Sequence, residues 1–215
     1  MEVAIRTEKK PDVVILLGGP ASGKGTQAKI LAERTGYSYF GTGDLLRAEM
    51  EKGSQLGKKI AGLMNSGELV PDDLTNPLVA RELAKIKGKG IVLDGYPRNL
   101  DQAENLQDIF PDENFLLINI TASVKSLLKR MQSRRICDKC GKIYTITNDK
   151  STCDVCGGKL IQRTDDSQEV LKKRINAYEE LTKPIIAYYR QKGLVREVDG
   201  EPPIPAVTKQ IEEII

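Results

Sequence analysis

The sequence predicts an α/β fold in which a parallel sheet is flanked by helices and carries two insertions. Short apolar runs alternate along the chain with longer segments of helical character, which is the pattern of βαβ units. The 215 residues are 40% hydrophobic, which is enough for one packed core with small insertions. Two segments interrupt the alternation and are therefore interpreted as the insertions. Residues 41–70 are helical in character without a strand, and residues 133–166 are polar and contain cysteine.

The predicted strands are short apolar runs, several of them rich in β-branched residues. The first, VVILL, is apolar throughout and ends in a glycine-rich loop, so it is interpreted as a buried strand. In chain order the five predicted strands lie at residues 13–17, 37–40, 90–95, 114–120 and 193–200.

The predicted helices are placed by their boundary residues. Pro71 with Asp72 and Asp73 marks the start of one helix, and a glycine ends each of the two short helices in the first insertion. In chain order the predicted helices lie at about residues 24–34, 42–53, 54–67 and 71–87, from near residue 123, and at 205–215. The predicted core is thus residues 1–40, 71–132 and 167–215, with residues 1–12 a short extension before the first strand.

Composition excludes several classes of function. The chain has no histidine, which removes histidine bases, triads and metal ligands. The net charge of +3 suits phosphate-bearing small ligands better than nucleic acid, which calls for a stronger basic surface with aromatic residues. No apolar run reaches the 18 or so residues of a membrane helix, and no signal peptide is evident. We therefore expect a cytoplasmic monomer that binds neither membrane nor nucleic acid.

The loop after the first strand carries a phosphate-binding motif. Gly18, Gly23 and Lys24 match the pattern G-x-x-x-x-G-K between a predicted strand and a predicted helix. Glycines let successive backbone N–H groups surround an anion, and the N-terminus of the helix adds positive charge. Gly25 stands where the motif usually has Ser or Thr, and Thr26 follows it.

Four cysteines in the second insertion predict a metal centre. Cys137, Cys140, Cys153 and Cys156 form C-x2-C-x12-C-x2-C, with a glycine after each pair. Four thiolates make a closed tetrahedral site, which indicates structural zinc, although iron fits the same geometry. Redox chemistry is a weaker alternative, because two matched pairs lie in one segment. That segment of about 34 residues is too small to form its own core, so a metal would supply the missing stability. Residues 141–152 alternate in part and suggest a small hairpin.

These motifs, together with the ending GKGTQ, resemble the nucleoside monophosphate kinases, and the resemblance extends along most of the chain. It is carried by TGDLLR (42–47), GELVPD (67–72), LDGYPRNLDQA (93–103), RMQSRR (130–135) and RTDDSQEVLKKR (163–174), in the order of the family. The strongest resemblance is to the long adenylate kinases with a zinc-binding lid. It implies a P-loop kinase fold, with 41–70 binding the acceptor and 133–166 as the lid. It also implies transfer of the terminal phosphoryl group of ATP to AMP, giving two ADP, with Mg2+.

The resemblance assigns roles to individual residues. The catalytic residues it implies are Lys24, Arg98, Arg134, Arg163 and Arg174. The ATP site would comprise Ala21, Ser22, Gly23, Lys24, Gly25, Thr26, Arg130, Arg134, Ile143, Tyr144 and Pro202. The AMP site would comprise Thr42, Arg47, Glu68, Leu69, Val70, Gly95, Tyr96, Pro97, Arg98, Gln102, Arg163 and Arg174. Asp94, with Asp44, would orient the water shell of Mg2+, and Tyr144 could equally pack on the cysteine cluster.

The chemistry that the resemblance implies needs no general base. A monophosphate has its second pKa near 6 and is already a nucleophile at pH 7. Thr42 and Gln102 correspond to the positions that read adenine, whereas pyrimidine kinases of the family commonly have Ala and Asn there. One departure is Ala21, where the family usually has glycine; at a position with positive φ, alanine costs about 1 kcal/mol.

Two other functions remain open at this point. The first is a kinase for another monophosphate, or one that uses GTP as donor. The second is a nucleotide-regulated zinc-ribbon module that binds nucleic acid through Lys139, Lys142, Lys150 and Lys159, although such lysines more often form a solvated surface.

Overall fold

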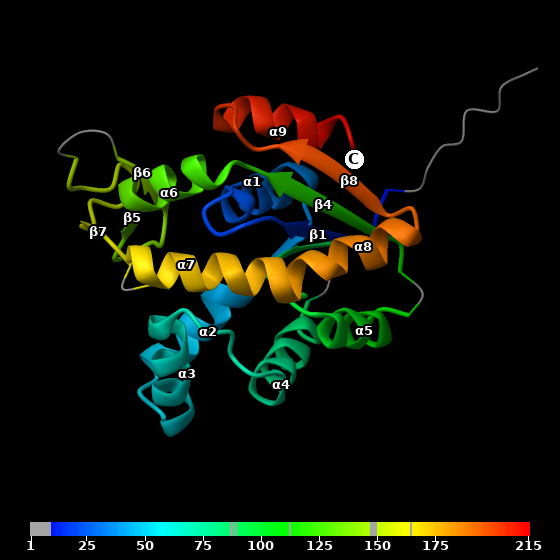
Figure 1. Ribbon diagram of the computed structural model, residues 1–215, viewed down its shortest axis with the longest axis horizontal. Coiled ribbons are helices and arrows are strands. Elements are labelled where there is room, and N and C mark those ends of the chain that lie inside the picture. Colours follow the sequence, from blue (N-terminus) through cyan, green and yellow to red (C-terminus); the bar gives the residue numbers. More distant parts are fainter. Residues whose placement is uncertain (1–9, 87, 89, 112, 147–149, 164) are drawn as a thin grey trace, which may run out of the picture.

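The computed structural model describes residues 10–86, 88, 90–111, 113–146, 150–163 and 165–215. Its central feature is a five-stranded parallel sheet in the order β2-β3-β1-β4-β8 (Figure 1). The strands are β1 (Val13–Leu17), β2 (Ser38–Gly41), β3 (Ile91–Asp94), β4 (Phe115–Thr121) and β8 (Val195–Asp199). The predicted α/β fold class is confirmed. All five predicted strands are present: β1 has the predicted ends, and the ends of the other four differ by one or two residues.

Helices cover both faces of the sheet, so the side chains of the central strands are buried alternately on the two faces. Val13, Ile15 and Leu17 pack toward α4 (Asp72–Leu83), α5 (Leu100–Ile109) and α8 (Lys183–Gln191). Val14 and Leu16 pack toward α1 (Lys24–Thr35) and α9 (Ile204–Glu212). Both faces of β1 are therefore dry, and its carboxyl end opens directly into the glycine-rich loop.

The first insertion is a helical pair, α2 (Thr42–Glu51) and α3 (Gln55–Ser66), which projects from the sheet beside α4 (Figure 1). Leu46, Ile60, Val70 and Leu78 form a separate small apolar cluster there. Ser54 caps α3, because its hydroxyl accepts a hydrogen bond from the Gly57 amide at 2.9 Å.

The second insertion is a small antiparallel sheet that follows α6 (Val124–Ser133). Its central strand β5 (Arg134–Cys137) pairs with β6 (Ile143–Thr145) and with β7 (Leu160–Ile161). The prediction of a hairpin within residues 141–152 is wrong. Among the described residues of this segment only β6 is a strand, and the partner of β6 is β5, which lies before the segment. The first cysteine pair forms the turn between β5 and β6, since the Cys137 amide donates to the Lys142 carbonyl at 3.0 Å.

A long helical run returns the chain from this sheet to the core. It comprises α7 (Gln168–Ala177), the π-helical turn η1 (Tyr178–Thr182) and α8, and it crosses the molecule between the two insertions (Figure 1). Neither this run nor α5 (Leu100–Ile109) was predicted from the sequence. The helix predicted at 71–87 ends earlier, at Leu83; residue 87 and the N-terminal residues 1–9 lie outside the described residues. None of the helices in the described ranges is long and apolar enough to cross a membrane.

Candidate active site

The loop between β1 and α1 is shaped to surround an anion. Gly18 and Gly23 have φ of 150° and 99°, and Gly23 directly precedes α1. A Cβ at Gly18 would lie 2.5 Å from the Ile120 carbonyl oxygen, so no side chain fits between the loop and β4. The Ser22 hydroxyl is buried and has no hydrogen-bond partner within the described part of the chain. An unpaired buried hydroxyl at a helix N-terminus fits a phosphate ligand.

Lys24 begins α1, and its ammonium donates to the Gly19 carbonyl at 3.1 Å. The pKa of Lys24 is lowered to about 7: burial is the largest cause, the charges of Arg98, Arg174 and Arg134 add to it, and Asp94 partly offsets them. A lysine held among arginines in this way is destabilised as a cation until an anion binds beside it.

Gly25 explains the departure from the usual motif. A Cβ at this position would lie 2.7 Å from the Asp94 carboxylate, which sits at the carboxyl end of β3. The chain thus has a glycine where Ser or Thr is usual because the Asp94 side chain occupies that space. Thr26, the next residue, lines the same cavity.

Ala21 adopts the left-handed conformation that the sequence analysis considered, with φ of 63°. An L-residue in this region is strained by about 1 kcal/mol relative to glycine. Ala21→Gly should therefore change the free energy of unfolding little or raise it by up to about 1 kcal/mol, since relief of strain is partly offset by the greater backbone freedom of glycine in the unfolded state. Denaturant unfolding measures this. A loss of more than about 1 kcal/mol would show that the alanine methyl makes a contact worth more than the strain.

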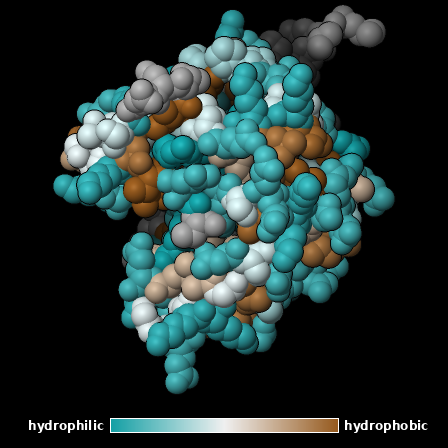
Figure 2. All heavy atoms as spheres, turned by 60° about the vertical axis from the view of Figure 1, so that its left-hand side comes forward, coloured by the Kyte–Doolittle hydropathy of each residue, from teal (hydrophilic) through white to brown (hydrophobic). Residues whose placement is uncertain are grey.

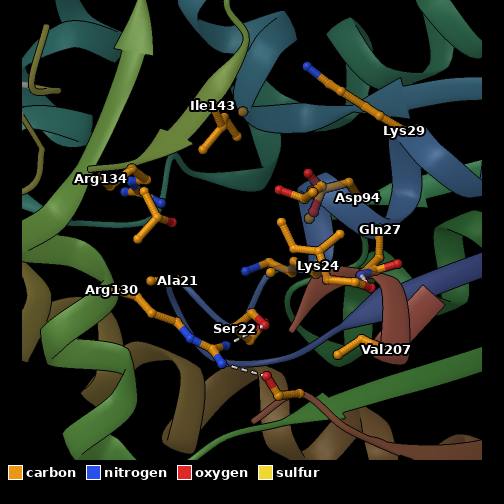
Figure 3. A pocket seen from close by; sticks show the side chains of 18 of the residues that line it. Ala21, Ser22, Lys24, Gln27, Lys29, Asp94, Arg130, Arg134, Ile143 and Val207 are labelled. Carbon is orange, nitrogen blue, oxygen red and sulfur yellow. Dashed lines mark hydrogen bonds between the residues drawn. The ribbon is translucent and has the colours of Figure 1, made fainter. Parts of the chain in front are cut away.

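A cavity of about 410 Å³ lies over the phosphate loop, within the size range of ligand pockets. Lys24, Asp94 and Arg134 point into it from three different elements (Figure 3). Ile143 and Thr145 of β6 line it on the side of the second insertion, and Pro202 lines it near α9. Figure 2, in which this part of the molecule comes forward, shows a surface that is mostly hydrophilic with smaller hydrophobic patches.

A second, smaller cavity of about 90 Å³ adjoins the first on the side of α3. Glu68 and Leu69 line it, as do Ala177, Tyr178 and Thr182 of the long helical run. The two cavities share the same set of cations and glycines, namely Lys24, Gly43, Arg47, Gly95, Arg98 and Arg174. Positive charge is therefore concentrated where the two spaces meet.

Arg47, Arg98 and Arg174 line both cavities, and Arg163 lines the larger one. Burial, followed by the charge of neighbouring arginines, lowers the pKa of Arg98 and of Arg163 to about 10, and burial lowers that of Arg174. The Nε of Arg163 is buried with no hydrogen-bond partner in the described residues. A cluster of this kind, which holds an unpaired Arg163 nitrogen in the described residues, is suited to a multiply charged anion.

Two buried aspartates hold two of the arginines. Arg174 donates to Asp165 at 2.8 Å, and Arg134 binds Asp166 through both its Nε and a terminal nitrogen, the Nε contact being 2.8 Å. Asp165 and Asp166 are 8% and 4% exposed, so each fixes a guanidinium without itself facing solvent. The sequence analysis quoted both acids within a motif but gave them no role.

Arg130 lies at the edge of the larger cavity. It donates to the Ser22 carbonyl at 3.2 Å and to the Gly200 carbonyl at 2.6 Å (Figure 3). It therefore ties α6 to the phosphate loop and to the segment before α9.

Several predicted contact residues do not line either cavity. Thr42 and Gln102 are buried, at 2% and 3% exposed. The Thr42 hydroxyl has no partner among the described residues. The Gln102 side chain donates to Asp72 and accepts from the backbone N–H of Arg98. Val70 belongs to the apolar cluster of the helical pair. Tyr96 is buried and bonds Asn76, and Pro97 is absent from both linings.

Tyr144 packs on the cysteine cluster rather than in the cavity. Its hydroxyl lies 3.2 Å from Cys153 Sγ, and Lys142 and Lys150 lie over its ring. The neighbours Ile143 and Thr145 face the cavity instead, because alternate residues of a strand point to opposite faces.

The four cysteines come together as the spacing predicts. All four Sγ atoms lie within 4.8 Å of one another, with Cys137 and Cys156 at 3.3 Å and Cys140 and Cys153 at 3.6 Å. Thiolates around a tetrahedral zinc, with Zn–S near 2.3 Å, are about 3.8 Å apart. The donor set therefore fits a closed four-thiolate metal centre.

Comparison with known proteins decides the family. Residues 16–194 match the family model described as adenylate kinase. The adenylate kinase of Archaeoglobus fulgidus is 41% identical over 210 residues, covering 94% of this chain and 97% of the relative. Those of Syntrophotalea carbinolica and Thermosipho melanesiensis are each 42% identical, covering 92% and 94% of this chain and 95% and 98% of the relatives.

The chain belongs to the adenylate kinase family.

Membership of the adenylate kinase family makes the chain a nucleotide phosphotransferase and gives the cation cluster a purpose. A phosphoryl group in transfer carries negative charge on its peripheral oxygens, and the family stabilises that charge by positioning donors around it. The junction of the two cavities, where Lys24, Arg98 and Arg174 converge, is the part of the structure suited to that charge.

Two carboxylates near the phosphate loop of this adenylate kinase family member suit a hard divalent cation. Asp94 and Asp44 both line the larger cavity. Burial opposes ionisation of Asp44, but hydrogen bonding and charge from Arg47, with Lys29 and Tyr39, lower its pKa to about 2. The ionised Asp44 beside the Asp94 side chain offers oxygen ligands that fit Mg2+, which binds through few carboxylates and retains waters.

We expect nucleotide binding to take up a proton. A polyphosphate beside Lys24 favours its charged form and should raise its pKa from about 7 toward its ordinary value of 10.5. Between those pH values the bound state holds more protons than the free state, so ATP affinity should fall as the pH rises. Calorimetry at pH 8.5 in buffers of different ionisation enthalpy measures the uptake, which Lys24→Arg should abolish. Uptake that persists in that variant would assign the proton to another group.

Proposed function

We propose that the chain catalyses the reversible, Mg2+-dependent transfer of the terminal phosphoryl group of ATP to AMP, giving two molecules of ADP. The single observation that carries this proposal is the pair of adjoining cavities that share Lys24, Arg98 and Arg174. One cavity contains the phosphate loop, and the other lies against the helical pair. Two nucleotides bound on opposite sides of a common cation cluster would have their phosphates facing each other.

The proposed roles follow from the position of each group. Backbone amides after Gly18, the Ser22 hydroxyl and Lys24 hold the phosphates of the donor. Arg47 and Arg98, which line both cavities, hold the acceptor phosphate. Arg134, Arg163 and Arg174 face the transferred group. Mg2+, oriented by Asp94 and Asp44, supplies neutralising charge at the donor phosphates when bound.

The reaction needs no proton transfer by the protein. An oxygen of the acceptor phosphate forms a bond to the γ-phosphorus, and the bond to the oxygen that bridges the β- and γ-phosphorus breaks, so that ADP leaves. The acceptor phosphate is ionised at neutral pH, which agrees with the absence of histidine. The chain contributes position and charge, and closure of the second insertion would exclude water from the phosphoryl group.

We further propose that residues 41–70 hold the acceptor, that 133–166 form a lid, and that the four cysteines bind a structural zinc. The protein would act as a monomer, since the described residues of one chain line both cavities. A cytoplasmic location is proposed because four free thiols in a metal-type arrangement suit a reducing compartment.

The proposal is tested with a panel of monophosphate acceptors and triphosphate donors in a coupled ADP assay. ATP with AMP should be the best pair. An equal rate with CMP or UMP, or with GTP as donor, would favour the alternative kinase. Binding of nucleic acid at physiological salt without ADP formation would favour a zinc-ribbon binding module.

Acceptor choice should depend on Thr42. Its hydroxyl is buried without a partner in the described residues and lines neither cavity, so it would meet the base only when the acceptor opens a path beside α2. Thr42→Ala should lower kcat/KM for AMP about tenfold, with little effect on the KM for ATP, because a site built to hydrogen-bond a base loses one bond. The matched control is CMP, whose poor turnover should change less. A loss of equal size for both acceptors would indicate a purely structural role for Thr42.

A further inference from the structure

Tyr39 of β2 reaches into the larger cavity and stands between its two carboxylates. The Tyr39 hydroxyl donates to Asp44 Oδ2 at 3.0 Å and lies 3.5 Å from Asp94 Oδ2. In the described part of the chain, it is the one hydrogen-bonding group within 3.5 Å of the Asp94 carboxylate. A phenol is protonated at neutral pH, so the Tyr39 hydroxyl is a hydrogen-bond donor between the two carboxylates.

Gly41, two residues along the chain, makes room for this hydroxyl. Its φ of −118° and ψ of 110° are ordinary extended values that any residue adopts, so the backbone does not require glycine. A Cβ there would lie 2.3 Å from the Tyr39 hydroxyl oxygen and 2.8 Å from the ring carbon that bears it. Gly41 is also the N-cap residue of α2 and makes no side-chain cap. A Ser, Thr or Asp at Gly41 would cap α2, but its Cβ would collide with the Tyr39 hydroxyl. Glycine therefore leaves the space that Tyr39 occupies.

The other side of the ring is also fixed. Lys29 of α1 lies 5.1 Å from the ring centroid and 3.2 Å from Asp44 Oδ2. Arg47 holds the other oxygen of the same carboxylate at 2.7 Å. Asp44 is thus anchored by two cations, whereas the Asp94 carboxylate has, among the described residues, a hydrogen bond from the tyrosine alone.

We propose that Tyr39 is a positioning residue that holds Asp44 and Asp94 in the arrangement that receives the hydrated Mg2+ of the donor nucleotide. The inference rests on the proposed function and deepens it. Two carboxylates that face one cavity repel each other, and a hydroxyl donor between them offsets part of that repulsion while no cation is present. Groups that orient metal-binding carboxylates contribute to metal affinity without touching the metal.

The test is the preference of the protein for magnesium-loaded ATP. Calorimetry gives the Kd of ATP with a chelator and with excess Mg2+. The Kd with chelator divided by the Kd with Mg2+ isolates the metal contribution without any turnover. Tyr39→Phe should reduce this ratio about fivefold, because a carboxylate loses the bond that orients it. It should also raise the Mg2+ concentration for half-maximal activity, while kcat at saturating Mg2+ stays close to that of the unmodified protein.

Tyr37→Phe is the matched control. Its hydroxyl donates to the Pro11 carbonyl at 2.8 Å and does not line either cavity, so the ratio should be unchanged. Gly41→Ala provides a second variant that displaces the Tyr39 hydroxyl without removing it, and it should reproduce the loss. A ratio in Tyr39→Phe that equals or exceeds that of the unmodified protein would overturn the inference. Failure of the unmodified protein to form ADP from ATP and AMP would instead refute the proposed function.

Discussion

Replacing Lys24 with alanine should lower kcat by about a thousandfold or more, with almost no change in melting temperature. The ammonium lies at the junction of the two cavities, where charge develops on the phosphoryl group. A preorganised donor at such a place acts on the transition state, and loss of one typically costs about a hundred- to a thousandfold; a full positive charge should cost more. Steady-state kinetics with saturating ATP, AMP and Mg2+ measure the effect.

Stability should not follow activity in this variant. The folded protein lowers the pKa of Lys24, so the charged side chain is less stable there than in the unfolded chain. Removing it takes away a partly buried cation among arginines, and the melting temperature should stay the same or rise slightly. Lys58→Ala, on the exposed surface of α3, is the matched control and should leave both quantities unchanged. Turnover within tenfold of normal in Lys24→Ala would remove this loop from the proposed mechanism.

The parts of the fold that the sequence predicted best are those fixed by local chemistry. The apolar run that becomes β1 is buried on both faces, and the glycines after it are needed where φ is positive or the backbone approaches β4. The cysteine spacing determines a turn geometry, so the four thiols converge. In both cases the residues that specify the structure lie within a few positions of one another.

The helical run α7–η1–α8 could not be recognised in this way. The π-helical turn inserts a residue into the helical register, so the apolar residues before it and after it do not share one period of 3.6. Pro184, which is usually a sign that a helix begins, lies just after that turn. The turn has a role in the site, because Thr182 donates to the Arg98 carbonyl at 2.8 Å and so fixes the segment that carries that arginine.

Partners distant in the sequence were also beyond prediction. Asp165 and Asp166 acquire their roles only when the second insertion brings them to Arg174 and Arg134. Tyr39 meets Asp94 because β2 and β3 are neighbours in the sheet, with Gly41 paired to Asp94. No spacing rule in one sequence reports such contacts, since they depend on strand order.

Loss of the metal should melt the second insertion before the core. Among the described residues from 134 to 163, the only buried ones are Cys137, Cys153 and Gly158. The insertion therefore has almost no apolar core of its own, and metal-binding energy becomes its folding energy. The parallel sheet keeps two extensive apolar clusters and should remain folded at moderate temperature.

We expect one zinc per chain, and its removal by a chelator should lower the melting temperature by about 10 °C, which corresponds to about 3 kcal/mol for a chain of this size. Cys137→Ser should reproduce most of this loss. Val155→Ser, next to Cys156 and at a position that is 65% exposed, should not. Metal analysis and melting curves with and without chelator measure both effects. A stoichiometry near zero with four reactive thiols would contradict the zinc assignment.

The same experiment separates a structural metal from a catalytic one. Arg134 begins β5 and Arg163 follows β7, so disorder of the small sheet should displace both from the cavity. Activity should then fall in parallel with loss of order in residues 134–163. Amide hydrogen exchange in that segment measures the loss of order. Lys24 and Arg98 lie outside the insertion, and ATP should still bind to the phosphate loop of the zinc-free protein. If turnover vanished while the small sheet kept its protection from exchange, the metal would act in the chemistry itself and the structural assignment would be wrong.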